Sequence, residues 1–230
     1  MSSLRSLSMP QTPMHDNHNP GLLALIPPSS RRLIEVGCST GAMAGEWRRL
    51  HPGSDWHGVE IDPVRAALAR RHCQQVDVLD IEQADDAFFT RHSTRDCWVF
   101  GDVLEHLRDP WRLLQRIRAG MSGDACVVVC IPNVQHWSLQ AALSRGEFRY
   151  VDAGLLDRTH LRWFTRQTLI ELFEDSGFGV VEFGSTQMDA PQADTVLRHI
   201  AALAQCSGGN AALAYNDAQA FQYLLRATPE

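Results

Sequence analysis

The stretch of this sequence best suited to chemistry is a loop of small residues, Gly37-Cys38-Ser39-Thr40-Gly41, that directly follows an apolar run. Small residues let a ligand lie against the backbone, and the helix expected after the loop begins with free N–H groups. Glu60 ends a second apolar run, 23 residues beyond Gly37. A carboxylate at such a place can bind both hydroxyls of a ribose. The spacing therefore indicates a nucleoside-binding site.

Three kinds of site compete for this loop. A dinucleotide site needs G-x-G-x-x-G, but Ser39 and Ala42 stand where it has glycine, and Glu35 would repel a pyrophosphate. A nucleophile elbow, G-x-S-x-G, would make Ser39 a nucleophile, but no glycine-rich oxyanion loop precedes it. An S-adenosylmethionine (SAM) site, E-x-G-x-x-x-G, accounts for Glu35, the loop and Glu60 together, because a carboxylate at Glu35 suits a cationic ligand.

With these residues the sequence resembles the class I SAM-dependent methyltransferases, in the small-molecule branch that includes ubiquinone-biosynthesis-type enzymes. The similarity spans about residues 30 to 185, and its specificity comes from the order and spacing of several short stretches rather than from any one of them. The matching stretches are Ile34–Gly41, Gly58–Pro63, Asp80–Glu82, Gly101–Pro110, Ile131–Asn133 and Leu155–Thr165.

The resemblance implies where the methionine part of the cofactor would lie. Gly37–Gly41, with Cys38 and Ser39, would pack on the methionine, and Glu35 would lie near its ammonium. Gly101, followed by Asp102, would lie near the methionine segment or the sulfonium. Ser39 departs from the family pattern, which often has glycine there, although a small hydroxyl should still fit.

The resemblance also implies the contacts of the adenosine part. Glu60 would bind the ribose hydroxyls, and Asp80 would accept a hydrogen bond from the adenine amino group. Ile81 or Ile61 would flank the adenine ring. The expected cofactor is therefore SAM.

Methyl transfer from a sulfonium is an in-line displacement, so an enzyme must align the nucleophile and, where needed, remove its proton. His106 follows the fourth expected strand, on the rim where open α/β sheets bind ligands, and an ordinary histidine titrates near pH ~6.5. His160 is the second candidate base. The alternative for His106 is that it braces the loop or caps the next helix together with Glu105.

The acceptor is expected to lie against polar and aromatic residues of the second half of the chain. A loop beside His160 could form a lid or, alternatively, an internally linked segment that orders the rim. The candidate acceptor-binding residues are His136, Trp137, Asp157, Arg158 and Trp163.

No metal is predicted. Asp102, Glu105 and His106 could supply ligands, but their spacing matches no recognised metal set. The remaining histidines, His57 and His92 among them, are interpreted as surface or strand residues.

Short apolar runs alternate with helical stretches, which is typical of a parallel sheet covered by helices. We expect a doubly wound, Rossmann-like, seven-stranded and mainly parallel sheet with helices on both faces, the last two strands being antiparallel. The expected strands are Arg32–Val36, Asp55–Ile61, Gln75–Leu79, Asp96–Phe100, Ala125–Ile131, Phe178–Phe183 and Phe221–Ala227. A flexible leader (1–20) would precede a single methyltransferase domain (21–230) with an inserted helical segment at about 184–220.

Composition limits the partners. With 21 basic and 27 acidic residues the net charge is −6, which disfavours a nucleic-acid partner. None of the six cysteines forms a C-x-x-C pair, so reduced thiols and a cytoplasmic location are expected, and no stretch reads as a bilayer span. The predicted function is methyl transfer from SAM to an O or N nucleophile of a small-molecule acceptor, by a possible homodimer. The alternatives are a nicotinamide-dependent oxidoreductase and a non-catalytic SAM-fold binding module.

Overall fold

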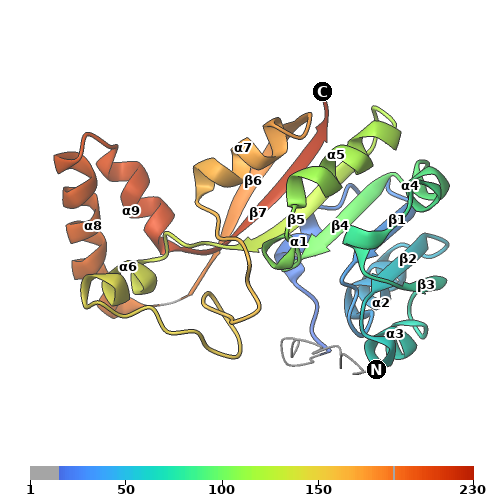
Figure 1. Cartoon of the computed structure of the whole chain (residues 1–230), viewed down its shortest axis with the longest axis horizontal. Coiled ribbons are helices and arrows are strands. Elements are labelled where there is room, and N and C mark those ends of the chain that lie inside the picture. Colours follow the sequence, from blue (N-terminus) through green and yellow to red (C-terminus); the bar gives the residue numbers. More distant parts are fainter. Residues whose placement is uncertain (1–15, 189) are drawn as a thin grey trace, which may run out of the picture.

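The computed structural model describes residues 16–188 and 190–230, so most of the predicted leader lies outside the described residues. A seven-stranded sheet with the order β3-β2-β1-β4-β5-β7-β6 forms its centre (Figure 1). Strands β1 to β5 are parallel, whereas β7 runs antiparallel to both of its neighbours. The predicted fold class is confirmed. The strands are β1 (Arg32–Val36), β2 (Asp55–Glu60), β3 (Gln75–Val78), β4 (Cys97–Gly101), β5 (Cys126–Pro132), β6 (Phe178–Gln187) and β7 (Ala220–Pro229).

Helices cover both faces of the sheet because successive strand residues point to opposite sides. Ile34 and Trp98 pack in one apolar cluster with α4, α5 and α7, while Leu33 and Val99 pack in another with α1, α2 and α3. The helices are α1 (Pro20–Leu25), α2 (Ala42–Leu50), α3 (Pro63–Ala69), α4 (Asp86–His92), α5 (Pro110–Gly120), α6 (Trp137–Ser144), α7 (Arg166–Glu174), α8 (Asp194–Cys206) and α9 (Ala211–Gln219), with short 3₁₀ turns η1 (Ile81–Gln83), η2 (Leu104–His106) and η3 (Pro191–Ala193).

Local sequence signals explain where several helices begin. Asp62 and Asp109 each cap a helix whose first residue is proline, and their carboxylates accept backbone N–H groups of the first turn. Thr165 and Thr168 form a capping box at the start of α7. These caps fix the entry of three helices into the layers on either side of the sheet.

The structure also has features that the sequence did not predict. Helix α4, capped by Asp85, lies between β3 and β4, where we predicted none. The last two strands are antiparallel as expected, and α8 and α9, which separate them in the chain, lie within the helical segment expected at about 184–220. The unexpected feature is the place of β7, which enters between β5 and β6. Helices α6, α8 and α9 lie beyond one end of the sheet, on the left of Figure 1. None of the helices within the described ranges has the length and apolar character needed to cross a bilayer.

Candidate functional site

The glycine loop joins β1 to α2 at the carboxyl edge of the sheet, tightly packed between two other segments. The backbone N–H of Gly37 donates to Val59 O at 2.8 Å. Gly37 has φ +72°, and a Cβ there would lie 2.6 Å from Val103 Cγ2. Gly41 has φ +83°, and a Cβ there would lie 3.0 Å from the backbone of Ala69. The loop therefore keeps its shape only with glycine at both positions, because Val103 and Ala69 fill the space that a side chain would need.

Ser39 adopts a backbone conformation that disfavours side chains, with φ +47°. We expect Ser39→Gly to raise the free energy of unfolding by about 0.5 to 1 kcal/mol, because it relieves this strain by more than it adds to the entropy of the unfolded chain. Thermal unfolding checks this. Ser93→Gly is the control, because Ser93 has φ −60° and the same exchange there should destabilise the protein. A lower melting temperature for Ser39→Gly would contradict the prediction.

Glu60 stands at the end of β2 and ties the glycine loop to the next turn. Its side chain is 5% exposed. One carboxylate oxygen accepts from Ser39 N at 2.8 Å and the other from Asp62 N at 2.9 Å. A carboxylate offers about four lone-pair positions, so these two bonds leave capacity for ribose hydroxyls. Its place beside the loop fits the ribose contact expected from the sequence.

Glu35 lies beneath the loop, on the face of the sheet that packs against α2 and α3. Its carboxylate accepts a hydrogen bond from Trp56 Nε1 at 3.0 Å. Burial raises the pKa of Glu35 well above its ordinary value, and the nearby Glu60 raises it further. A cationic group held at the loop would favour the ionised form of this carboxyl.

The residues expected around adenine follow β2 and β3. Asp80 caps η1, and its two oxygens accept from Glu82 N at 3.0 Å and Gln83 Nε2 at 2.8 Å. Ile81 is 5% exposed and belongs to the core, whereas Ile61 is 55% exposed. Of the two predicted flanking side chains, Ile61 has the open surface that a stacked ring needs.

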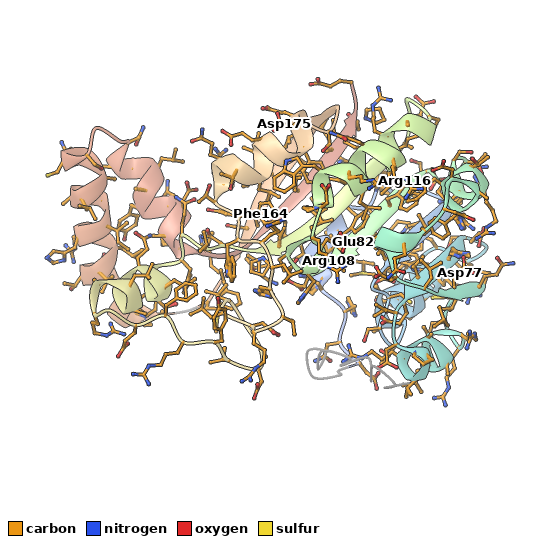
Figure 2. The ribbon with its side chains drawn as sticks, viewed as in Figure 1. Asp77, Glu82, Arg108, Arg116, Phe164 and Asp175 are labelled. Atoms are coloured by element: carbon orange, nitrogen blue, oxygen red, sulfur yellow. The ribbon has the colours of Figure 1, made fainter. Side chains whose placement is uncertain are left out.

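Two further contacts hold the loops around this edge. Glu82 accepts the backbone N–H groups of Arg108 and Asp109 at 3.0 and 2.9 Å, which ties η1 to the start of α5 (Figure 2). After Gly101, Asp102 has φ +54°, and its carboxylate accepts from Gln222 Nε2 at 2.6 Å. Strand β7 thus reaches back to the predicted cofactor edge.

The structure brings His106 and His160, the two predicted catalytic residues, into edge-to-face contact with ring centroids 4.9 Å apart. Burial lowers the pKa of both imidazoles. Glu105, only 1% exposed, lies beside them, with Oε1 4.0 Å from His160 Nε2. Neither Glu105 oxygen has a hydrogen-bond partner among the described residues. Backbone bonds from Leu161 N and Arg162 N to Glu105 O fix the loop containing His160 against η2.

The predicted acceptor residues of this loop divide into two groups. Asp157 is 2% exposed and accepts from Thr159 N at 2.9 Å, so it orders the loop from within. Arg158 is half-exposed and pairs with Asp152 at 2.6 Å. Trp163 packs against Phe148 and Tyr150, whose rings are 42% and 52% exposed. The aromatic cluster, defined by these three rings, presents an apolar surface beside the rim.

His136 and Trp137 follow β5 but face different surroundings. His136 is buried against Phe221, and burial lowers its pKa to about 4. Trp137 lines a cleft of about 440 Å³ between α6, α8 and α9, together with Leu197 and Tyr215. The two residues therefore do not share one pocket.

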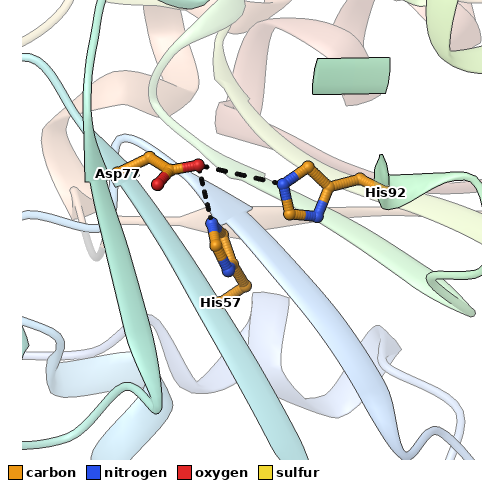
Figure 3. Close-up of side chains that lie close together, drawn as sticks. All are labelled: His57, Asp77 and His92. Carbon is orange, nitrogen blue, oxygen red and sulfur yellow. Dashed lines mark hydrogen bonds and ion pairs between the residues drawn. The ribbon is translucent and has the colours of Figure 1, made fainter. Parts of the chain in front are cut away.

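The sequence reading missed a second cluster, His57, Asp77 and His92, drawn in Figure 3. His57 and His92 are 1% and 2% exposed, so His92 is not the surface or strand residue we predicted. Asp77 Oδ2 lies 3.2 Å from His57 Nε2 and 3.9 Å from His92 Nε2. The three residues come from β2, β3 and α4, and α4 itself was not predicted. Arg91 forms an ion pair with the same oxygen of Asp77, at 3.2 Å.

Comparison with known proteins gives a single family. A family described as a methyltransferase domain matches residues 14–183. No curated protein sequence matches the chain.

Solved structures resemble the fold. Magnesium protoporphyrin IX methyltransferase from Synechocystis PCC 6803, with bound SAH, superposes with a TM-score of 0.58 at 13% identity, covering 91% of this chain and 78% of that one. A possible histamine N-methyltransferase from Thermotoga maritima gives 0.58 at 16%, covering 91% and 87%. The [4+2]-cyclase SpnF gives 0.57 at 17%, covering 90% and 79%. At sequence identities this low, the superpositions show that the folds are alike and nothing further.

Proposed function

This chain belongs to the methyltransferase domain family and is a SAM-dependent methyltransferase, and we propose that it methylates an O or N nucleophile of a small-molecule acceptor. The observation that carries the proposal is the carboxyl edge of the sheet. There the glycine loop, which has no room for a Cβ at Gly37, meets the buried Glu60 and, on the far side, Gly101. The same edge carries His106 and His160.

The residues at this edge fit SAM, which supplies an electrophilic methyl group on a sulfonium. Gly37–Gly41 offers bare backbone to the methionine part, and Glu60 offers acceptors to the ribose. Asp80 and Ile61 lie at the ends of the next loops, where adenine would bind. These contacts hold the donor in one orientation, and alignment of this kind contributes about 7 to 11 kcal/mol to such reactions.

The acceptor would enter over the rim formed by η2 and the loop at 145–163. The aromatic cluster offers area for a flat or apolar acceptor, while His106 and His160 orient its nucleophile. The net charge of −6 supports a small molecule over a nucleic acid. The five buried, unpaired cysteines support a reducing, cytoplasmic setting.

Two measurements test this function. Calorimetry with SAM and with SAH should show one cofactor site, and release of SAH should follow when phenols, alcohols or amines are supplied. Binding of NADH in place of SAM would favour an oxidoreductase. SAM binding without SAH formation, across acceptors of every one of these classes, would favour a non-catalytic binding module.

A further inference from the structure

We propose that Glu105, His106 and His160 bind a divalent transition-metal ion at the rim of the cofactor site. One ligand atom from each residue lies within 4.8 Å of the others. Within the part of the chain that the structure describes, neither Glu105 oxygen has a hydrogen-bond partner, although the residue is 1% exposed. A buried carboxylate is costly unless it is paired, so this side chain points to a missing positive partner.

Hydrogen bonds orient both imidazoles for ligation. His106 Nδ1 lies 3.2 Å from the carbonyl oxygen of Thr159, and His160 Nδ1 lies 3.3 Å from that of Leu155. A carbonyl only accepts, and the Thr159 hydroxyl, whose Oγ1 lies 3.1 Å from His106 Nδ1, donates its proton to Asp157 Oδ1 at 2.7 Å. Each Nδ1 therefore carries the proton, and each Nε2 keeps its lone pair. Metal-ligating histidines commonly donate their other ring N–H to a backbone carbonyl in this way.

The charges around Glu105 also favour a cation. Asp102 and Asp157, the charged side chains that act on it most strongly, are themselves acidic. Arg158, which follows Asp157 in the sequence, forms an ion pair with Asp152. Two neutral imidazoles and a group of carboxylates therefore attract a divalent ion.

The cluster of His57, Asp77 and His92 has the same donor types but a different electrostatic setting. Arg91 already lies 3.2 Å from the Asp77 oxygen that faces the two histidines, and Arg95 acts on both imidazoles as a further positive charge. A metal ion there would have to displace a guanidinium. This cluster therefore serves as the control site.

The donor set indicates the kind of ion and its role. Two imidazole nitrogens and one carboxylate oxygen suit Zn²⁺, Co²⁺ or Mn²⁺ better than Mg²⁺, and three protein ligands leave positions open. At the rim, an open position suits the hydroxyl of an acceptor, whose pKa a bound metal lowers. The proton would pass to water. As the new C–O bond forms, the C–S bond breaks and its electron pair stays on sulfur. This role rests on the proposed methyl transfer, whereas binding of the ion does not.

The test is titration of the chelator-treated full-length protein with Co²⁺, followed by visible absorption and calorimetry. The wild type should bind one Co²⁺ at this site, displaced by Zn²⁺. Glu105→Gln and His160→Asn should each weaken Co²⁺ binding at least 100-fold. Asp77→Asn, the control, should bind Co²⁺ as the wild type does. Absence of Co²⁺ binding at millimolar concentration, or its loss only in Asp77→Asn, would overturn the proposal.

Two further readouts separate the causes of failure. Without metal, Glu105→Gln should melt above the wild type, because burial and the nearby Asp102 raise the pKa of the Glu105 carboxyl and glutamine carries no such ionisation cost. Co²⁺ should raise the melting temperature of the wild type and of Asp77→Asn, but not that of Glu105→Gln. SAM titration of each protein tests the cofactor site independently. Co²⁺ binding without SAM binding would refute the methyl-transfer role alone, and SAM binding without Co²⁺ binding would refute the metal site alone.

Discussion

Gly37→Ala is expected to lower the affinity for SAM at least about 100-fold and to destabilise the fold by roughly 2 to 5 kcal/mol. The added Cβ would lie 2.6 Å from Val103 Cγ2, and Gly37 itself has φ +72°, a conformation strained for alanine. Valine is stiff about χ1, so relief requires the loop or the start of η2 to move. Either movement changes the surface on which the methionine part would lie. Calorimetry with SAM and chemical denaturation measure the two effects.

Gly53→Ala is the control that separates the steric overlap with Val103 from the strain of a positive φ. Gly53 has φ +85°, yet no atom of residues 16–188 or 190–230 lies within 4 Å of a Cβ built there. The control should therefore lose only about 1 to 2 kcal/mol of stability and keep its full affinity for SAM. Equal SAM affinities in the two variants would show that the loop at Gly37 does not carry the cofactor.

Glu60→Gln is expected to weaken binding of both SAM and SAH by roughly 10- to 150-fold, equivalent to about 1.5 to 3 kcal/mol for hydrogen bonds to a charged group. The exchange keeps the shape of a side chain that is 5% exposed but removes its charge and one acceptor oxygen. SAM and SAH share the ribose, so both affinities should fall by the same factor. Calorimetry measures both.

Asp62→Asn is the matched control for Glu60. Asp62 lies two residues away and its side chain caps α3 through Val64 N at 2.7 Å. Asparagine is also a good cap, so stability and SAM affinity should change little. A loss of SAM affinity in Asp62→Asn as large as that in Glu60→Gln would contradict the prediction that Glu60 is the carboxylate that binds the ribose.

The first half of the fold could be predicted because its signals are local. Proline after aspartate at Asp62 and Asp109 marks helix starts, and Cys126–Pro132 is apolar on both faces, as a central parallel strand requires. Helix α4 was missed because its apolar face consists of little more than Phe88 and Phe89 within seven residues. The place of β7 depends on pairing across the whole second half, which no local pattern encodes.

The candidate site divides in the same way. The loop at Gly37–Gly41 and the downstream Glu60 carry their signal in residue types and spacing. The contact between Glu105 and His160 joins residues 55 positions apart and depends on how the intervening loop docks. The same holds for the second cluster, in which the pairing of β2 with β3 brings His57 to Asp77 and His92 joins them from α4. Histidine alone gives no signal of which other side chains it will meet.

The order of strands has a consequence for synthesis of the protein. Strand β7 fills the gap between β5 and β6, although it is the last strand to leave the ribosome. Until then the Val127–Ile131 edge of β5, which pairs with β7 in the finished sheet, remains open. A long apolar strand with an open edge is a template for aggregation. Folding of this sheet therefore stays incomplete until β7 has emerged from the ribosome, and chaperones that shield such an edge should increase the yield.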